Sequence, residues 1–245
     1  MSGFSESNQT PAFPTTHWSQ VVRSLDGSSA ESRAALESLC AAYWYPLYAF
    51  IRRRGHDPDA AADLVQGLFA HLLERKAFAA ADPDRGRIRT FLLAVSRHFI
   101  ADRDAERRAK KRGGGHGVVS IDALNAENRY GAEPVDDVTP ERLFERAWAL
   151  AMLERALGAL RAEYQHSGKG PLFEHLEPSL AGGSGVERFA VTAEALNMSE
   201  GAVHVAAHRL RRRYRELVRD EIATTVDDPC EIDDELRALF GAVAS

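Results

Sequence analysis

Residues 188–220 read RFAVTAEALNMSEGAVHVAAHRLRRRYRELVRD, and this stretch predicts two helices joined by a tight turn. Asn197 lies at the turn, and asparagine is one of the few residues that tolerate a left-handed backbone. Ser199 is a good N-cap for the second helix, because its side-chain oxygen can accept a hydrogen bond from a free backbone N–H. From Ser199 onward, apolar residues recur every three or four positions, which is the period of one helix face. They are Val203, Ala207, Leu210, Tyr214 and Leu217.

The opposite face of this second helix is basic. A step of about 100° per residue puts on it Val205, His208, Arg209, Arg212 and Arg219, flanked by His204, Arg211 and Arg215. An apolar back and an arginine-rich front, entered through a short turn, have the form of a helix-turn-helix recognition helix, which reads base edges and holds phosphates. A merely solvated surface is the alternative. The six arginines against one glutamate in residues 209–219 favour DNA.

The net charge of −5 is concentrated at the end of the chain. Residues 226–245 hold six acidic side chains and one arginine, so the charges of residues 1–225 nearly cancel. Within that part, basic residues cluster at 107–112 and 209–219. Because local fields rather than net charge govern contact with nucleic acid, the acidic total does not exclude DNA binding.

The composition also indicates in which cellular compartment the protein is expected. With 245 residues and a hydrophobic fraction of 44%, the chain can form packed cores. Polar residues interrupt every apolar run before it could span a membrane, and the N-terminus lacks the pattern of a secretory signal. Cys40 and Cys230 lie far apart and near no cluster of metal ligands, which argues against a disulfide framework or a zinc finger. We therefore expect a cytoplasmic protein without membrane contact.

No nucleophile–base pair and no phosphate-binding loop is visible, so we expect neither an enzyme nor a cofactor. His204 and His208 are four residues apart on a predicted helix, a spacing that suits a metal ion. Residue 205 is a valine, however, and no third ligand is near. The pair is interpreted as a surface facing DNA or solvent, and no metal site is expected.

The sequence predicts an all-α protein of two helical domains joined by a flexible linker, with a helix-turn-helix in the second domain. Its segments are an N-terminal extension (1–29), a first domain (30–112), a linker (113–138), a second domain (139–221) and an acidic tail (222–245). The helical period predicts long helices over about 31–54, 58–76, 88–112 and 139–165, and a short one near 172–180. Pro46 is expected to end or kink the first of these, and Gly55 to cap it. Thr139 and Pro140 mark the start of the second domain.

Two charged segments allow more than one interpretation. The helix over 88–112 ends in AERRAKKR, which is either a solvated helix end favoured by the helix dipole or a nucleic-acid contact. In the tail, Asp228 and Pro229 predict a helix start. Apolar residues follow at helical spacing, namely Ile232, Leu236, Leu239, Phe240 and Val243. This helix either docks on the protein's own basic surfaces and restrains DNA binding, or completes the second core or frays. The pattern slightly favours the second interpretation.

Over about residues 18–220 the chain resembles a family, the two-domain sigma factors of bacterial RNA polymerase, of the extracytoplasmic-function type within the sigma-70 family. Three motifs in the family's order carry the resemblance: ADLVQGLFAHLLER at 62–75, GRIRTFLLAVSRHFIADRDAERRAKKR at 86–112 and AEALNMSEGAVHVAAHRLRRRYREL at 193–217. They resemble, in turn, the helix that binds the polymerase core, the segment that opens the −10 promoter element and the helix-turn-helix that reads the −35 element.

The resemblance implies three sets of contacts. Those with the polymerase core would be Asp63, Leu64, Gln66, Leu68 and Phe69. Those with the −10 element would be Arg85, Arg87, Arg89, Phe91, Arg97, His98, Arg103, Arg107 and Arg108. Those with the −35 element would be His204, Val205, His208 and Arg209 toward bases, and Arg211 and Arg212 toward phosphates.

The chain also departs from the family's pattern. Acidic residues that the family often shows around Asp63 are replaced by Ala60, Ala62 and Gly67, which weakens the negative patch offered to the polymerase. Phe91 stands where tryptophan is common, and His98 where asparagine is common. The recognition helix differs as well, with Ala202, His204, Val205 and Ala206 in place of the usual polar and basic residues. The base preference therefore cannot be copied from the family, and Val205 could meet a thymine methyl.

The function implied is that of a sigma factor, which directs the polymerase to promoters by binding the −35 element and opening the −10 element to initiate transcription. Its partners would be the RNA polymerase core, promoter DNA, and an anti-sigma factor or other regulator. The alternatives are a stand-alone helix-turn-helix transcriptional regulator, which would bind duplex DNA without polymerase, and a sigma-mimic interaction protein.

Overall fold

The structure is a computed structural model, and it describes residues 30–74, 87–109, 121–133, 138–180, 186–226 and 228–244. Throughout these ranges the chain forms helices and turns, and no strand. The predicted all-α class is therefore confirmed for the described part of the chain. None of its helices combines the length and the apolar character that crossing a membrane requires.

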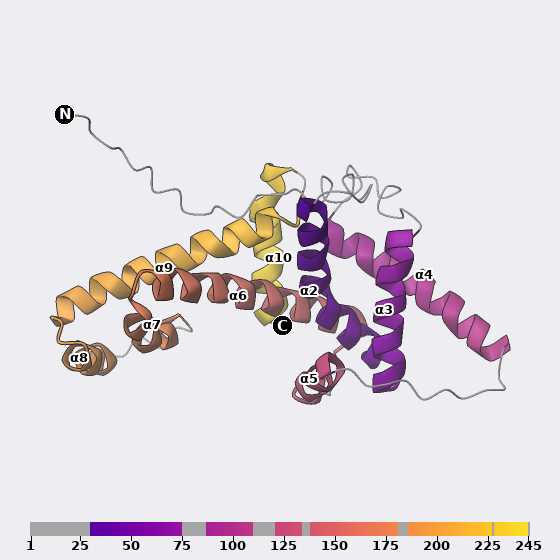
Figure 1. Cartoon of the computed structure of the whole chain (residues 1–245), viewed down its shortest axis with the longest axis horizontal. Coiled ribbons are helices and arrows are strands. Elements are labelled where there is room, and N and C mark those ends of the chain that lie inside the picture. Colours follow the sequence, from indigo (N-terminus) through magenta and orange to yellow (C-terminus); the bar gives the residue numbers. More distant parts are fainter. Residues whose placement is uncertain are drawn as a thin grey trace.

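The first helices are α2 (Ala30–Arg53), α3 (Pro58–Glu74), α4 (Ile88–Ala109) and α5 (Ile121–Gly131) (Figure 1). Helix α2 does not end at Pro46, which lies inside it. Buried side chains such as Tyr43, Leu47 and Phe50 flank the proline on both sides, and their packing sustains the helix although one backbone N–H is missing. Gly55 follows the helix with a φ of +94°, and its N–H donates to the Arg52 carbonyl at 3.0 Å, as expected for a cap.

The remaining elements are α6 (Pro140–His166), α7 (Gly170–Leu176), the 3₁₀ turn η2 (Glu177–Ser179), α8 (Val186–Ala195), α9 (Glu200–Ala223), the 3₁₀ turn η3 (Pro229–Glu231) and α10 (Ile232–Ala244). The predicted start of α6 is confirmed, because the Thr139 hydroxyl accepts a hydrogen bond from the N–H of Arg142. The predicted start in the tail is also confirmed. The Asp228 side chain accepts from the N–H of Cys230, and α10 follows η3.

Helix α6 carries two hydrophobic clusters, one on each half. We call the first cluster the α2 cluster; it joins α2, α3 and α4 to residues 143–152 of α6. The second, called the α9 cluster, joins α7, α8 and α9 to Ala156 and Leu160. At 1.5 Å per residue this unbroken helix is about 40 Å long, and it therefore spans both clusters.

Residues 113–138, predicted as a flexible linker, contain the helix α5. Ala126 of α5 is buried in the α2 cluster, and Glu127 forms an ion pair with Arg52 of α2 at 2.7 Å. The described part of this stretch is therefore folded onto the first helices.

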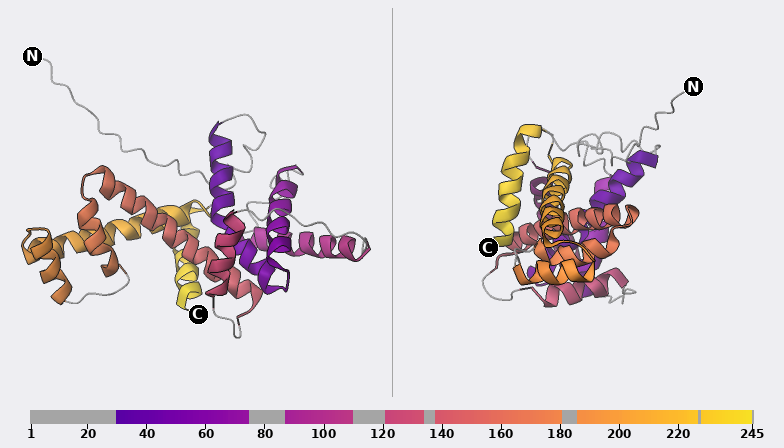
Figure 2. Two further views of the ribbon diagram at one scale, coloured as in Figure 1. Left: turned by 60° about the horizontal axis from the view of Figure 1, so that its bottom comes forward. Right: turned by 90° about the vertical axis from the view of Figure 1, so that its left-hand side faces the viewer.

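The C-terminal elements return to the α2 cluster. Ile222 near the end of α9 and Leu239 of α10 are fully buried in it. Figures 1 and 2 show α9 running along α6, with α10 beside the end of α9 near the middle of the molecule. The predicted division into two separate domains is not confirmed, since α6, α9 and α10 tie the two clusters together.

Candidate nucleic-acid interface

The turn between α8 and α9 consists of residues 196–199. Asn197 has a φ of +52°, which is the left-handed conformation expected from the sequence. The N–H of Met198 donates to the Ala193 carbonyl at 2.8 Å, and the N–H of Asn197 to the Glu194 carbonyl at 3.3 Å. These two bonds form a Schellman motif, which satisfies the last carbonyls of α8. The next helix begins two residues later.

The N-terminus of α9 is capped as predicted. The N–H of Ala202 donates to the Ser199 hydroxyl at 3.2 Å, and Ser199 has an extended backbone. The apolar face of the helix is then buried in the α9 cluster through Val203, Ala207 and Leu210. Because 3.6 residues make a turn, this burial fixes which side chains of α9 face solvent.

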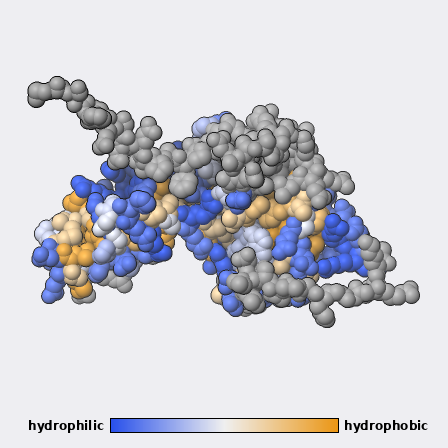
Figure 3. All heavy atoms as spheres, viewed as in Figure 1, coloured by the Kyte–Doolittle hydropathy of each residue, from blue (hydrophilic) through white to orange (hydrophobic). Residues whose placement is uncertain are grey.

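The exposed face of α9 contains five of the six residues for which the sequence predicts −35 contacts. They are His204, Val205, His208, Arg209 and Arg212. Val205 is 51% exposed, so an apolar side chain lies among the polar ones on this face. Figure 3 shows hydrophobic residues among hydrophilic ones at the end of the molecule where Figure 1 has α8 and the start of α9. The face therefore combines apolar, imidazole and guanidinium groups.

Neighbouring residues contact several side chains of this face and hold them in place. The ring of His204 lies 4.5 Å from the ring of Phe189 on α8, at an interplanar angle of 60°. Arg212 is 68% exposed and lies 3.6 Å from Glu216 of its own helix. Arg211 differs from the other five, because it is half-buried and its Nε donates to the Ser179 carbonyl at 3.3 Å. In this structure, Arg211 is directed toward η2.

Two other arginines of α9 bind carboxylates of the same chain. Arg213 donates to both oxygens of Glu163 on α6, at 2.6 and 3.0 Å, and these bonds raise its pKa. Arg219 lies 2.5 Å from Asp233 of α10. The basic run of 209–219 thus serves two purposes, since part of it packs α9 against its neighbours. In the described ranges, no group of three or more histidine, cysteine, aspartate or glutamate residues could hold a metal ion.

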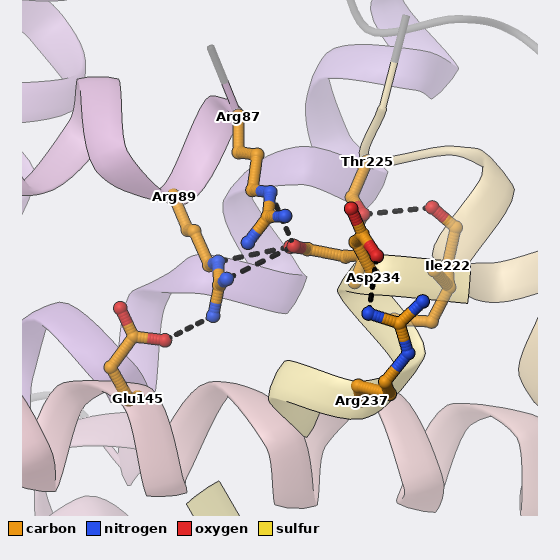
Figure 4. Close-up of polar contacts among 8 residues, drawn as sticks. Arg87, Arg89, Glu145, Ile222, Thr225, Asp234 and Arg237 are labelled. Atoms are coloured by element: carbon orange, nitrogen blue, oxygen red, sulfur yellow. Dashed lines mark hydrogen bonds and ion pairs between the residues drawn. The ribbon is translucent and has the colours of Figure 1, made fainter. Parts of the chain in front are cut away.

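The start of α4 carries two arginines with predicted −10 contacts, and both are bound to the tail. The Nε of Arg87 lies 2.9 Å from Oε2 of Glu235, a residue of α10. Arg89 has its Nε 2.9 Å from Oε1 of Glu235, and its Nη2 donates to Oε2 at 3.0 Å. Figure 4 shows the side chains of Arg87 and Arg89 side by side, both extending toward the same side, with Glu145 next to Arg89. Arg85 lies outside the described residues.

Arg89 is enclosed by α6 as well. Its Nη1 donates to Glu145, and its guanidinium carbon lies 4.5 Å from the centroid of the Trp148 ring. Only 6% of Arg89 is exposed, so its guanidinium group does not face solvent. A −10 contact through Arg89 would require these partners to move.

The rest of α4 is more open. Arg97 is exposed and donates to Glu141 of α6 at 2.9 Å, and the exposed ring of His98 bonds the Ala94 carbonyl. Phe91 is half-buried and packs against the α2 cluster. Farther along, the exposed basic side chains are Arg103, Arg107 and Arg108. Arg103 is paired with Glu106 at 2.9 Å, and Arg108 donates to the Asp104 carbonyl.

Helix α3 divides its predicted polymerase contacts between surface and core. Asp63 and Gln66 are exposed, whereas the apolar members Leu64, Leu68 and Phe69 are buried in the α2 cluster. A Cβ at Gly67 would lie 3.3 Å from Cζ of Phe99, a tight contact that a shift of the Phe99 ring would have to relieve, so α3 and α4 pack closely at this position. The three apolar residues support the helix, and its exposed face has a single carboxylate near the middle.

Sequence reasoning missed the residues that hold Arg87 and Arg89. Glu235 is completely buried, although glutamate is among the residues least often buried unless paired. A signal was present, because Glu235 falls on the same helix face as Ile232, Leu236 and Leu239. A carboxylate within an apolar stripe predicts a buried cationic partner, but nothing in the spacing identifies which arginine that is.

Comparison with known proteins gives no match: no family model, curated protein or solved structure is significantly similar to the chain.

Proposed function

We propose that the protein is a sigma factor that directs bacterial RNA polymerase to specific promoters. The observation that carries the proposal is the exposed face of α9, where two histidines, a valine and two arginines stand above a buried apolar face. The short ordered turn before α9 fits a helix-turn-helix. The sequence resemblance to extracytoplasmic-function sigma factors supplies the link to polymerase.

In the proposed mechanism, the first turns of α9 enter the major groove of the −35 element. His204, Val205, His208 and Arg209 face the bases, and Arg212 holds a phosphate. The Ser199 cap and the contact between His204 and Phe189 support this by fixing the start of the helix before DNA arrives. A pre-ordered surface loses less conformational entropy on binding.

Helix α4 is proposed to hold the opened −10 strand. Its exposed arginines at 97, 103, 107 and 108 lie along one helix, where Arg97 pairs with Glu141 and Arg103 with Glu106. Cationic side chains with nearby aromatic rings suit single-stranded DNA. Helix α3 is proposed to face the polymerase core through Asp63 and Gln66, which are exposed on it.

Run-off transcription tests the proposal. Core polymerase would be given genomic DNA fragments with and without the protein, and the protein should produce transcripts that start at defined sites sharing one upstream motif. Arg212→Ala should lower this output several-fold on all promoters, since a phosphate contact is independent of sequence. Arg237→Ala is the matched control, because Arg237 is also exposed and paired within its own helix. It should leave transcription unchanged.

Two other outcomes have defined meanings. Binding to duplex DNA without any effect on polymerase would indicate a stand-alone helix-turn-helix regulator. Failure to bind either DNA or the polymerase core would indicate an interaction protein that merely mimics a sigma factor.

A further inference from the structure

Helix α10 is seated on the molecule by one face, on which Ile232, Leu236 and Ala242 pack partly buried against the α2 cluster. Of its thirteen residues, Glu235 and Leu239 are the ones that are buried, and Leu239 inserts into the α2 cluster. The outer face is open, with Phe240 58% exposed and Asp233, Asp234 and Arg237 also exposed. Because only one face of α10 is packed, the helix can leave this seat by local opening, without unfolding the rest of the molecule.

The polar half of this seat is the Glu235 carboxylate. It meets Arg89 through two nitrogens and Arg87 through one, all at 2.9–3.0 Å. Burial raises the pKa of Glu235, while the two arginines oppose that shift. Removing a carboxylate from water is costly unless it is paired and hydrogen-bonded, so these arginines are what allow α10 to dock here.

The same arginines have predicted roles in DNA binding. The planar fork of a guanidinium group fits a carboxylate and a phosphate equally well, because both present two oxygens in one plane. While Glu235 is docked, Nη2 of Arg89 donates to it and the Nε atoms of Arg87 and Arg89 lie within ion-pair distance of it. The carboxylate therefore covers the side of both guanidinium groups that a phosphate would approach, and Nη1 of Arg89 is bonded to Glu145. The carboxylate and a nucleic-acid phosphate therefore compete for one site.

A second contact of α10 also joins one of its carboxylates to an arginine of another segment. Asp233 lies 2.5 Å from Arg219 of α9, so carboxylates of this one helix meet arginines of two other segments, Arg219 on α9 and Arg87 directly before α4. Within the described part of the chain, Asp234, the residue between these two carboxylates, pairs with Arg237 of α10 itself. The acidic residues of the tail are thus not interchangeable.

We propose that α10 is an autoinhibitory helix, which masks Arg87 and Arg89 through Glu235 until nucleic acid displaces it. The proposal rests on the proposed function only in assigning the displacing ligand to DNA. Ligands that bind only the undocked state shift the population toward it, so binding and release of α10 are thermodynamically coupled.

The test uses the full chain without polymerase and a fluorescent single-stranded DNA oligonucleotide of mixed sequence, since arginine–phosphate contacts do not depend on sequence. Glu235→Gln removes the charge that competes with phosphate and should tighten binding at least about fivefold, the lower end of coupling between two sites. Asp234→Asn is the matched control, because it removes the same charge one residue away and breaks no contact with α4. Its affinity should stay within about twofold of the unaltered chain, a change of roughly 0.4 kcal/mol.

Equal affinities for Glu235→Gln and the unaltered chain would overturn the proposal, as would equal gains for both variants, because the effect would then reflect net charge alone. Absence of binding by every variant would overturn it too, since no masked phosphate site would exist. Should Glu235→Gln fail to fold, hydrogen exchange on the unaltered chain decides the matter. Saturating oligonucleotide should increase exchange of the α10 amides, and unchanged protection would contradict release.

The two proposals fail in distinguishable ways. Promoter-specific transcripts together with unchanged affinity of Glu235→Gln would leave the sigma function standing and remove the autoinhibition. A gain in affinity without any transcripts would retain the masking helix and remove the sigma function.

Discussion

The side chain of Arg89 connects three helices. Its guanidinium group contacts Glu235 of α10, Glu145 of α6 and the face of the Trp148 ring. A lysine could not reproduce these contacts, because an ammonium group lacks the planar fork and the stacking face. Arg89 is therefore a structural junction of α4, α6 and α10 in the described conformation.

Replacing Arg89 by alanine should lower the free energy of unfolding by about 3 kcal/mol, because two carboxylates lose the cation that compensates for their burial. Urea unfolding measures this loss. Arg97→Ala is the control, since its pair with Glu141 is exposed and should contribute less than about 1 kcal/mol. Equal losses in the two variants would contradict the role assigned to Arg89.

Arg209 is the residue of α9 best suited to distinguish base from phosphate contact. We expect Arg209→Ala to relax base preference at one position of the −35 element, because a good bidentate pair with a base gives about 1–3 kcal/mol of discrimination. Selection of promoters from a randomised −35 library by the polymerase complex measures this. A variant that binds all sequences equally less well would show that Arg209 contacts only phosphate.

For single residues, the sequence predicted which side chains are buried or exposed better than it predicted which residues they contact. The period of α9 correctly identified Val203 and Leu210 as buried and His208 as exposed, because burial follows from helical geometry. It could not show that Arg89 is enclosed by Glu235, since the two lie 146 residues apart in the chain and meet only through the packing of α10.

Among the elements, the turn between α8 and α9 is set by the left-handed backbone of Asn197. Asn197→Val should destabilise the protein by about 1–2 kcal/mol, because a side chain with a branched Cβ is strained at this φ. Asn197→Gly should change stability by only a few tenths of a kcal/mol, since glycine adopts the conformation freely. Thermal unfolding compares the two, and similar losses would mean that the turn does not depend on its backbone conformation.

Helix α5 is held to α2 by Glu127. The hydrogen bond from Arg52 lowers the pKa of Glu127 below its usual 4.5, and the Tyr48 hydroxyl acts in the same direction. A lowered pKa means that the pair stabilises the fold above the unfolded value and that this contribution is lost as pH falls through the folded one. The contribution is about 1 kcal/mol or less, because the pair is partly exposed.

Glu127→Gln should therefore be less stable than the unaltered chain at neutral pH. The difference should shrink below pH 4.5 and disappear as the pH falls through the lowered pKa of Glu127. Urea unfolding over a pH series measures the difference. Glu154→Gln provides the comparison, since Glu154 is an exposed partner of another arginine, Arg129. A difference that persists in acid would show that the carboxylate charge is not what matters at position 127.

The long helices were predictable because each has a strong apolar period and recognisable ends. Pro140 begins α6 as predicted, and the bounds of α2 and α3 differ from the predictions by two residues or fewer. Helix α5 was missed because charged and amide residues make up five of its eleven positions and because it lies among glycines and prolines. Its stability comes from tertiary contacts such as those of Glu127, which local propensity does not contain.

At the scale of the molecule, α6 is the rod on which both hydrophobic clusters form. The sequence predicted a domain boundary at Thr139, where this helix does begin, but it could not show that residues 143–152 pack against α2. An amphipathic helix pattern gives a buried face without naming the partner that covers it. The packing of α10 against the α2 cluster, beside the end of α9, is therefore a feature that only the structure reveals.

The most direct measurement of the central claim is a footprint of promoter DNA bound by core polymerase with this protein. The account predicts two separate effects on one start site, an upstream protected segment that is lost in Arg209→Ala and a downstream opened segment that is reduced when Arg107 and Arg108 are replaced by alanine. Upstream protection that survives Arg209→Ala, or a complex that never opens its DNA, would contradict the claim that two basic surfaces of this chain contact separate promoter elements.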